Sequence, residues 1–521
     1  MIKSIDKTKI LWVDDEIDHL KPHILFLENK SYEVSTCTNG LDALKVIKNN
    51  RFDIVLLDEN MPGLNGLDTL GELKKNNPEL PVIMITKNEA EHIMDDAIGR
   101  KISDYLIKPV NPYQILIALK KILNIKNLIE GKTIQSYQQE YRKISNSLIE
   151  INSANDWVSL YQKMTYWELE LEKLDDQVMF EIFKNQMKEA NSQFSNFIQK
   201  NYSNWITNNI DAPILSHNMF KKKVLPFIKE NQPSILLLID NLRLDQWKTI
   251  SPLIQKHYYL NDDECYFSIL PSATQYSRNS IFSGMTPKQM QEHYPKWWKN
   301  DNEDGGKNLY EFNFLESQLN RLNKNIKFSY NKITSISGGK KLVKNLKKYK
   351  SEDLTVVVYN FVDMISHAKT EMEIIKELAP DNKAYRSLTL SWFKNSPLFE
   401  FIQSANKEGF RLIVTTDHGT INVEKPLEIK GKKEMSSNLR YKSGRSMSYE
   451  KKKVVEVKNL NEFELPKTFL DTSFIFAKDN DYFVYQNNFN HFANLYNNTF
   501  QHGGISMEEI IIPFATFSPK K

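Results

Sequence analysis

Short, mainly apolar runs that end in acidic or hydroxyl side chains recur along this 521-residue chain and restrict its fold more than any other feature. In the second half, residues 235–239 are followed by Asp240, and residues 411–416 are followed by Asp417 and His418. Such runs are typical of buried parallel strands, whose ligand-binding groups come just after their carboxyl ends. We therefore expect these side chains to meet at one edge of a parallel sheet.

Three further residues that could bind a metal lie next to apolar runs. Asp363 and His367 follow the apolar run of residues 355–362, and His502 precedes the last apolar segment. Each residue alone is explained as well by a structural hydrogen bond. As a set with the three residues above, three His and three Asp suit zinc, although ligand type alone leaves Mn²⁺ open.

Residues 270–284 predict a Pro-containing loop that leads into a short amphipathic helix. We expect Ser272 or Thr274 at or near the N-cap, where backbone N–H groups and the helix dipole favour an anion. An ordinary cap is the simpler interpretation. Arg278 lies four residues after Thr274 on the same helical face, so it could bind a phosphoryl oxygen or a neighbouring carboxylate.

The first 125 residues alternate short apolar runs with amphipathic stretches, which predicts a parallel sheet flanked by helices. Five polar side chains follow predicted strands, although a single Asp at such a place is usually a helix cap. Clustered carboxylates can hold Mg²⁺ and accept a phosphoryl group, which a Thr and a Lys can then bind. The predicted strands are residues 9–13, 54–57, 81–85 and 105–107, and the five residues are Asp14, Asp15, Asp58, Thr86 and Lys108.

Between the two α/β segments, residues 126–210 contain a single Gly and no Pro, and apolar residues recur at helical spacing. We predict a small helical bundle or connector, with its aromatic residues in the core rather than in a ligand site. The whole chain carries a formal charge of +4 and only Cys37 and Cys265, and its first residues lack an apolar signal segment. No membrane insertion and a cytoplasmic location are therefore expected.

The first segment resembles two-component receiver domains, including residues 58–63 and 104–109. This resemblance implies a flavodoxin-like fold with strand order 2-1-3-4-5 and a cis peptide before Pro109. It implies phosphorylation of Asp58 by a sensor histidine kinase, phosphoryl contacts from Thr86 and Lys108, and an inward swing of Tyr105 on activation. Phosphorylation is expected to favour a homodimer. The implied Mg²⁺ ligands are Asp14, Asp15, Asp58 and the carbonyl of Asn60.

The stretch from Asn231 to Pro513 resembles the PglZ-type branch of the alkaline-phosphatase superfamily. The helix signature of residues 280–284 places the family's nucleophile at Thr274, which implies a covalent phosphothreonine and a zinc-dependent phosphodiesterase. The resemblance implies one Zn²⁺ on Asp363, His367 and His502, and a second on Asp240, Thr274, Asp417 and His418.

An insertion at about residues 424–459 is rich in basic residues, and two interpretations are open. It is a solvated face, or it is a mobile lid that attracts a polyanionic substrate. Among its basic residues are Lys430, Lys432, Lys433, Arg440, Lys442, Arg445, Lys451, Lys452 and Lys453.

The order of the segments resembles the PorX-type response regulators associated with type IX secretion. We predict a multidomain α/β protein with a receiver at residues 1–125, a helical connector at 126–210 and a phosphatase-like α/β domain at 211–521. The first hypothesis is a receiver that controls a phosphodiesterase acting on an oligonucleotide or cyclic nucleotide. The alternative is an adaptor that binds a secretion-system subunit or a sigma factor without turnover. The natural substrate, the cognate kinase and the sign of the control are left open.

Overall fold

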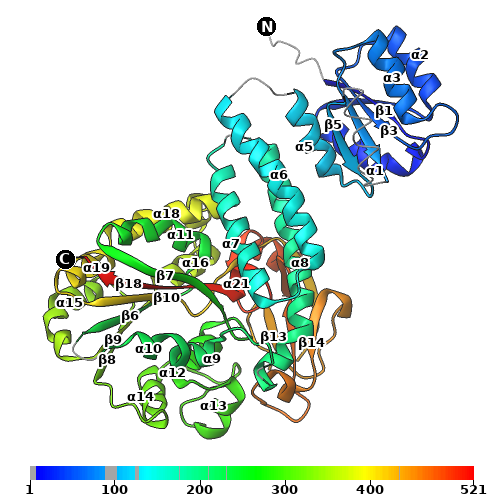
Figure 1. Cartoon of the computed structure of the whole chain (residues 1–521). Helices are drawn as coiled ribbons and strands as arrows, with labels where there is room; N and C mark the ends of the chain where they lie inside the picture. The colour runs from blue at the N-terminus through cyan, green and yellow to red at the C-terminus, as the bar shows by residue number, and fades with distance from the viewer. Residues whose placement is uncertain are drawn as a thin grey trace. The chain divides into compact units, whose positions relative to one another are not determined.

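The computed structural model describes residues 8–87, 102–123, 128–174, 176–208, 210–229, 232–432 and 434–520. The chain separates into two compact units (Figure 1): Met1–Lys143 with Lys173–Ile182, and Ile144–Glu172 with Phe183–Lys521. The expected boundary near residue 125 and Lys433 of the basic insertion lie outside the described residues. Within the described ranges, no helix is both long and apolar enough to cross a membrane.

The first unit contains a five-stranded parallel sheet in the order β2-β1-β3-β4-β5, which confirms the predicted flavodoxin-like topology. Strands β3 and β4 are buried along their whole length because helices cover both faces of the sheet. The Lys108–Pro109 peptide is cis, as expected. The elements are β1 (Thr8–Val13), α1 (Lys21–Asn29), β2 (Tyr32–Cys37), α2 (Gly40–Asn49), β3 (Ile54–Asp58), α3 (Gly66–Asn76), β4 (Val82–Thr86), β5 (Asp104–Ile107) and α5 (Pro112–Leu123).

Three long helices follow the receiver fold: α6 (Leu128–Glu150), α7 (Ala154–Leu171) and α8 (Gln177–Asn208). Helix α7 begins with a capping box, in which the Ser153 hydroxyl accepts from the backbone N–H of Asp156 and the Asp156 carboxylate accepts in return. Trp157 and Tyr161 of this helix are buried, and Trp157 packs on Phe194 of α8. These aromatic residues therefore lie in the core, as predicted, whereas Tyr166 of the same helix is exposed.

The second unit is built on a six-stranded sheet in the order β7-β18-β10-β6-β9-β8. The last four strands are parallel, whereas β18 runs antiparallel to both of its neighbours. Helices α11 and α18 lie on one face, and α9, α12 and α14 lie on the other (Figure 1). The strands are β6 (Ser234–Ile239), β7 (Tyr258–Phe267), β8 (Phe328–Ile333), β9 (Leu354–Tyr359), β10 (Arg411–Thr415) and β18 (Ile511–Pro519).

Strands β6, β9 and β10 are neighbours in register, so their carboxyl ends lie together. Ile239 pairs with Tyr359, and Leu238 pairs with Thr415. The apolar run of residues 355–362 crosses two elements: β9 ends at Tyr359 and α16 begins at Phe361. The helices are α9 (Ser216–Met219), α10 (Leu225–Phe227), α11 (Leu244–Gln255), α12 (Thr274–Ser283), α13 (Pro287–His293), α14 (Glu311–Arg321), α15 (Ile336–Asn345), α16 (Phe361–Glu371), α17 (Glu373–Leu378), α18 (Asn382–Asn395), α19 (Pro397–Lys407), α20 (Phe489–Tyr496) and α21 (Met507–Ile510).

The basic insertion is folded, and it buries two of its cations while others stay exposed. Its strand β13 (Tyr441–Gly444) is wholly buried, and Arg440 and Lys442 are fully buried as well, whereas Lys430, Lys432 and Lys451 are exposed. The small sheets are β13 with β15 (Ser473–Ala477) and β14 (Val454–Val457), β12 (Lys425–Ile429) with β16 (Asp481–Tyr485), and β11 (Ile421–Val423) with β17 (Thr499–Gln501). Apolar residues of the insertion's strands pack with those of β15 and β16 into a small core, so the segment is not an unstructured charge run.

Candidate functional site

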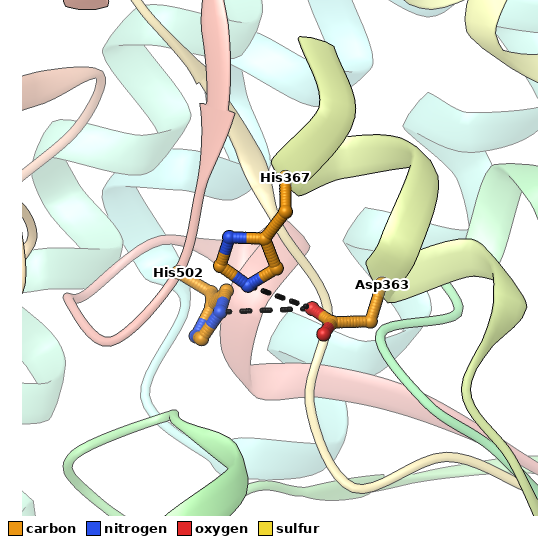
Figure 2. A group of neighbouring side chains, drawn as sticks. All are labelled: Asp363, His367 and His502. Atoms are coloured by element: carbon orange, nitrogen blue, oxygen red, sulfur yellow. Dashed lines mark ion pairs between the residues drawn. The ribbon is translucent and has the colours of Figure 1, made fainter. Parts of the chain in front are cut away.

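The first group of potential metal ligands consists of Asp363, His367 and His502 (Figure 2). Asp363 and His367 are four residues apart on α16, and His502 follows β17. The Asp363 Oδ1 lies 3.5 Å from His367 Nε2 and 3.8 Å from His502 Nε2. The His367 side chain is 60% exposed, whereas that of His502 is 12% exposed. This group is therefore reachable from solvent on the His367 side.

The second group is fully buried behind the strand ends. His418 Nε2 lies 3.8 Å from Asp240 Oδ1 and 3.9 Å from Asp417 Oδ2. The Thr274 Oγ1 lies 2.9 Å from the same nitrogen. In each of the two groups, one ligand atom from every Asp and His lies within 4.8 Å of the others.

The two groups adjoin through their histidines and through an asparagine. The rings of His418 and His502 stack with centroids 4.2 Å apart. The Asn241 side-chain amide donates to Asp363 Oδ1 at 3.3 Å, and its backbone N–H donates to Asp417 Oδ1 at 3.4 Å. Sequence reasoning missed Asn241, although its position directly after Asp240 at a strand end was a usable signal.

Asn360 is a second amide that sequence reasoning missed. It follows the end of β9 and donates to Asp240 Oδ2 at 2.8 Å, so it helps to orient that carboxylate. The other oxygen, Asp240 Oδ1, is buried and has no hydrogen-bond partner. A buried carboxylate oxygen without a partner is costly unless a cation completes it. The ligand chemistry and this oxygen therefore fit a bound divalent cation.

Burial dominates the electrostatics of the site. It raises the pKa of Asp240 well above its ordinary value despite the nearby Arg278, and the neighbouring carboxylate of Asp417 adds to the rise. Burial, reinforced by His418 and His367, lowers the pKa of His502 far below its ordinary value. His502 is therefore neutral near pH 7, which is the form that binds a metal.

Thr274 is the first residue of α12, and the N-cap is Ala273 without a side-chain cap. Ser272 and Thr274 thus lie directly before and after the N-cap, as expected, but neither side chain caps the helix. The Ser272 hydroxyl donates to the Gly504 carbonyl at 2.8 Å. The Thr274 hydroxyl therefore has no capping role and is the one that meets His418.

Arg278 takes the second of the two roles considered for it. Its side chain is fully buried, and its Nε donates to Asp417 Oδ2 at 2.9 Å. Its NH2 group forms an ion pair with Asp240 Oδ2. Arg278 thus binds carboxylates, and a direct phosphoryl contact is wrong for this conformation because no part of the guanidinium reaches a surface.

The receiver residues form a third group. Lys108 Nζ lies 3.0 Å from Asp14 Oδ2 and 2.9 Å from Asp58 Oδ1, while the side chain of Asp15 is exposed. Asp14, Asp15 and Asp58 each offer a ligand atom within 4.8 Å of the others, so they fit a bound cation. Burial raises the pKa of Asp58 although Lys108 opposes it.

Two other predicted receiver residues have partners outside this group. The Thr86 hydroxyl donates to Glu59. Asn60, whose carbonyl is an expected Mg²⁺ ligand, is the next residue after Glu59 and is exposed. The Tyr105 ring is half-buried, and the Arg142 guanidinium of α6 lies over it at 5.7 Å from the centroid. Arg142 also approaches Asp104 Oδ1 at 3.6 Å. Tyr105 is therefore in contact with the helix that follows the receiver.

Comparison with known families divides the chain into three parts. Residues 219–517, more than half of the chain, match the BREX system PglZ alkaline phosphatase-like domain. Residues 127–206 match the PorX response regulator linker domain, and residues 10–120 match the response regulator receiver domain. The three matches follow one another in the predicted order.

Several response regulators are similar to part of the chain. The transcriptional regulatory protein ZraR of Klebsiella oxytoca is 31% identical over 144 residues, which cover 28% of this chain and 32% of ZraR. The response regulator SaeR of Staphylococcus aureus is 33% identical over 116 residues, or 22% of this chain and 50% of SaeR. The matches thus span a third to a half of these relatives. A solved receiver domain from Clostridium thermocellum is 33% identical and covers 23% of this chain and 98% of its own, with a TM-score of 0.22.

Proposed function

Because the chain belongs to the family of PglZ alkaline phosphatase-like domains, we propose that its second unit hydrolyses phosphodiesters with two bound Zn²⁺ ions. The proposed ligands are Asp363, His367 and His502 for one ion, and Asp240, Thr274, Asp417 and His418 for the other. The observation that carries this proposal is that the Thr274 hydroxyl lies 2.9 Å from His418 Nε2, in a group that adjoins the first one through His502. Two metal ions in such a site stabilise the attacking and leaving oxygens of a displacement at phosphorus.

Thr274 is the proposed nucleophile. Its hydroxyl loses a proton to solvent, and its Oγ forms a bond to phosphorus while the bond from phosphorus to the leaving alkoxide breaks. The alkoxide takes up a proton, and the phosphothreonine formed still carries the other ester group. Water then attacks the same phosphorus, releases the phosphate monoester and restores the threonine hydroxyl. The backbone N–H groups at the start of α12 favour the anionic phosphoryl group because the positive end of the helix lies there.

The substrate proposed here is an oligonucleotide or a cyclic nucleotide. Arg440 and Lys442 are buried, so they cannot attract such a substrate from solution. Lys430, Lys432 and Lys451 of the insertion remain exposed. Exposed cations attract polyanions, which is compatible with this substrate class.

We propose that a sensor histidine kinase phosphorylates Asp58, with Mg²⁺ on Asp14, Asp15, Asp58 and the Asn60 carbonyl. Lys108 already contacts Asp58, and the Thr86 hydroxyl would exchange Glu59 for a phosphoryl oxygen. An inward movement of Tyr105 would change its contact with Arg142 of α6. Control of type IX secretion and a phosphorylation-favoured homodimer complete this proposal, with segment boundaries near residues 125 and 210.

Hydrolysis of a bis-aryl phosphate by the zinc-loaded full chain tests the catalytic part. We expect Thr274→Ala to lower kcat by at least about 1,000-fold because the nucleophile is lost. Ser277→Ala is the matched control on the same helix, since its hydroxyl donates only to the Ala273 carbonyl at 2.8 Å. Equal rates for the wild type and Thr274→Ala would instead favour an adaptor without turnover.

The regulatory part is tested separately by measuring molecular mass in solution with beryllofluoride and Mg²⁺. We expect the phosphoryl mimic to change the oligomeric state of the wild type and to leave Asp58→Ala unchanged. The same response in both proteins would contradict control through Asp58.

A further inference from the structure

Arg278 lies at the centre of a buried charge network behind the second ligand group. Its guanidinium contacts three carboxylates, and all three are buried: Asp240 through NH2, Asp417 through Nε, and Glu311 through NH1 at 3.5 Å. Side-chain exposure is 0% for Arg278, Asp240 and Asp417 and 2% for Glu311. Each nitrogen of the planar guanidinium therefore lies within ion-pair distance of a buried carboxylate.

Glu311 accepts hydrogen bonds from two side chains of strand β8. Its Oε2 accepts from the Tyr330 hydroxyl at 2.6 Å and from Lys332 Nζ at 2.8 Å. Both partners lie on β8, at the edge of the central sheet. These two bonds hold Glu311 Oε2 in place, while its Oε1 lies 3.5 Å from Arg278 NH1 as an ion pair without a hydrogen bond.

The two carboxylate oxygens of Asp240 have different neighbours. Its Oδ2 is taken by Arg278 and by the Asn360 amide, whereas Oδ1 has no hydrogen-bond partner and lies 3.8 Å from His418 Nε2. In Asp417, Oδ2 accepts from Arg278, and Oδ1 accepts from the backbone N–H of His418. Arg278 thus holds one side of each carboxylate and leaves Asp240 Oδ1 directed at the proposed metal position.

We propose that Arg278, held by Glu311, is a positioning residue for the second metal site: it keeps Asp240 and Asp417 ordered and charge-compensated before a cation binds. This inference rests on the proposed function only in taking Asp240 and Asp417 as metal ligands. Two buried carboxylates close to one another repel and are poorly solvated, so they need a positive partner. Without Arg278, the two carboxylates keep their neutral hydrogen-bond donors but lose this buried counterion, so the fold depends more strongly on a bound cation.

The thermal unfolding of the full chain, stripped by a chelator and then reloaded with Zn²⁺, tests this role. We expect Arg278→Gln to lower the Tm of the stripped second unit and to enlarge the zinc-dependent rise in Tm by about 5–10 °C over that of the wild type. The matched control is Arg386→Gln. Arg386 is also buried among three carboxylates, Glu168, Glu172 and Asp245, but none of them is a proposed metal ligand. Its loss should lower both Tm values equally.

Arg278→Lys provides a second variant in case Arg278→Gln does not fold. Lysine keeps the charge but cannot contact both carboxylates at once, so its zinc-dependent rise should also exceed that of the wild type. Equal, non-zero rises in the wild type and the Arg278 variants would overturn the role of Arg278 alone. A wild type whose Tm does not respond to Zn²⁺ would overturn the metal site and, with it, this inference.

Discussion

Arg440 and Glu509 form a fully buried, bidentate ion pair that joins the basic insertion to the segment after His502. Arg440 Nε lies 3.0 Å from Glu509 Oε1, and NH2 lies 2.7 Å from Oε2. Glu509 Oε1 also accepts from the backbone N–H of Gly504 at 2.9 Å. The insertion therefore supports the loop that carries a proposed zinc ligand, a role that neither interpretation of its sequence included.

Arg440→Met should lower the free energy of unfolding of the second unit by about 3–5 kcal/mol, because it leaves the Glu509 carboxylate buried without its counterion. Urea unfolding followed by tryptophan fluorescence measures the change. Arg445→Met is the control in the same insertion. Arg445 pairs with Glu434 at 2.9 Å in a partly exposed position, so its loss should cost less than about 1 kcal/mol. Similar losses in the two variants would contradict the assigned importance of the buried pair.

Because Lys442 is buried, we expect the second unit to become more stable as the pH rises above 7. Burial lowers its pKa to about 7, although Asp301 opposes the change. The unfolded lysine holds its proton up to its ordinary pKa near 10.5, so the unfolded chain binds more protons between pH 7 and 10.5. The free energy of unfolding should therefore rise with pH across this window, by roughly 4 kcal/mol for this one group.

Lys442→Met should remove this contribution. Urea unfolding at pH 7, 8.5 and 10 should show a smaller increase in the variant than in the wild type, with the variant the more stable at pH 7. Parallel pH profiles for the two proteins would show that Lys442 keeps its proton when buried. Its contacts with the Ser436 carbonyl at 3.0 Å and the Tyr485 ring at 4.6 Å would then be sufficient to hold the charge.

Lys108→Ala should make the first unit more dependent on Mg²⁺. The substitution removes the cation between Asp14 and Asp58, and a bound Mg²⁺ replaces the lost charge. The rise in Tm on adding saturating Mg²⁺ should exceed that of the wild type, equivalent to about 1–3 kcal/mol of additional stabilisation. Lys120→Ala is the matched control, because Lys120 is equally buried but pairs with Asp176. A larger Mg²⁺ response in the control than in Lys108→Ala would refute the explanation.

Asn241→Gly should lower zinc affinity by about 10- to 100-fold, since the side-chain amide that orients Asp363 is lost. Glycine is the informative replacement because Asn241 has φ +63°, which glycine adopts without strain and alanine does not. Competition with a chromophoric chelator measures the affinity. Asn241→Ala should bind zinc no better than Asn241→Gly, and unchanged affinity in Asn241→Gly would rule out this role of the amide.

The sequence by itself determined the parallel receiver sheet and the strand ends that carry Asp58, Asp240 and Asp417. Apolar run length and the residue that ends a run are local properties, and neighbouring parallel strands then bring these ends to one edge. Even so, the local pattern misplaced the end of β9, because the apolar residues continue past Asn360 into α16.

Only the tertiary structure decided what the buried charges contact. Arg278 and Asp417 are 139 positions apart, and Arg440 and Glu509 are 69 apart. Nothing local to Arg278 distinguishes a phosphoryl ligand from a carboxylate, and nothing local to Lys442 distinguishes a surface lysine from a buried one. The role of a charged side chain depends on which groups surround it and on how much water is excluded, and these are set when distant segments pack together.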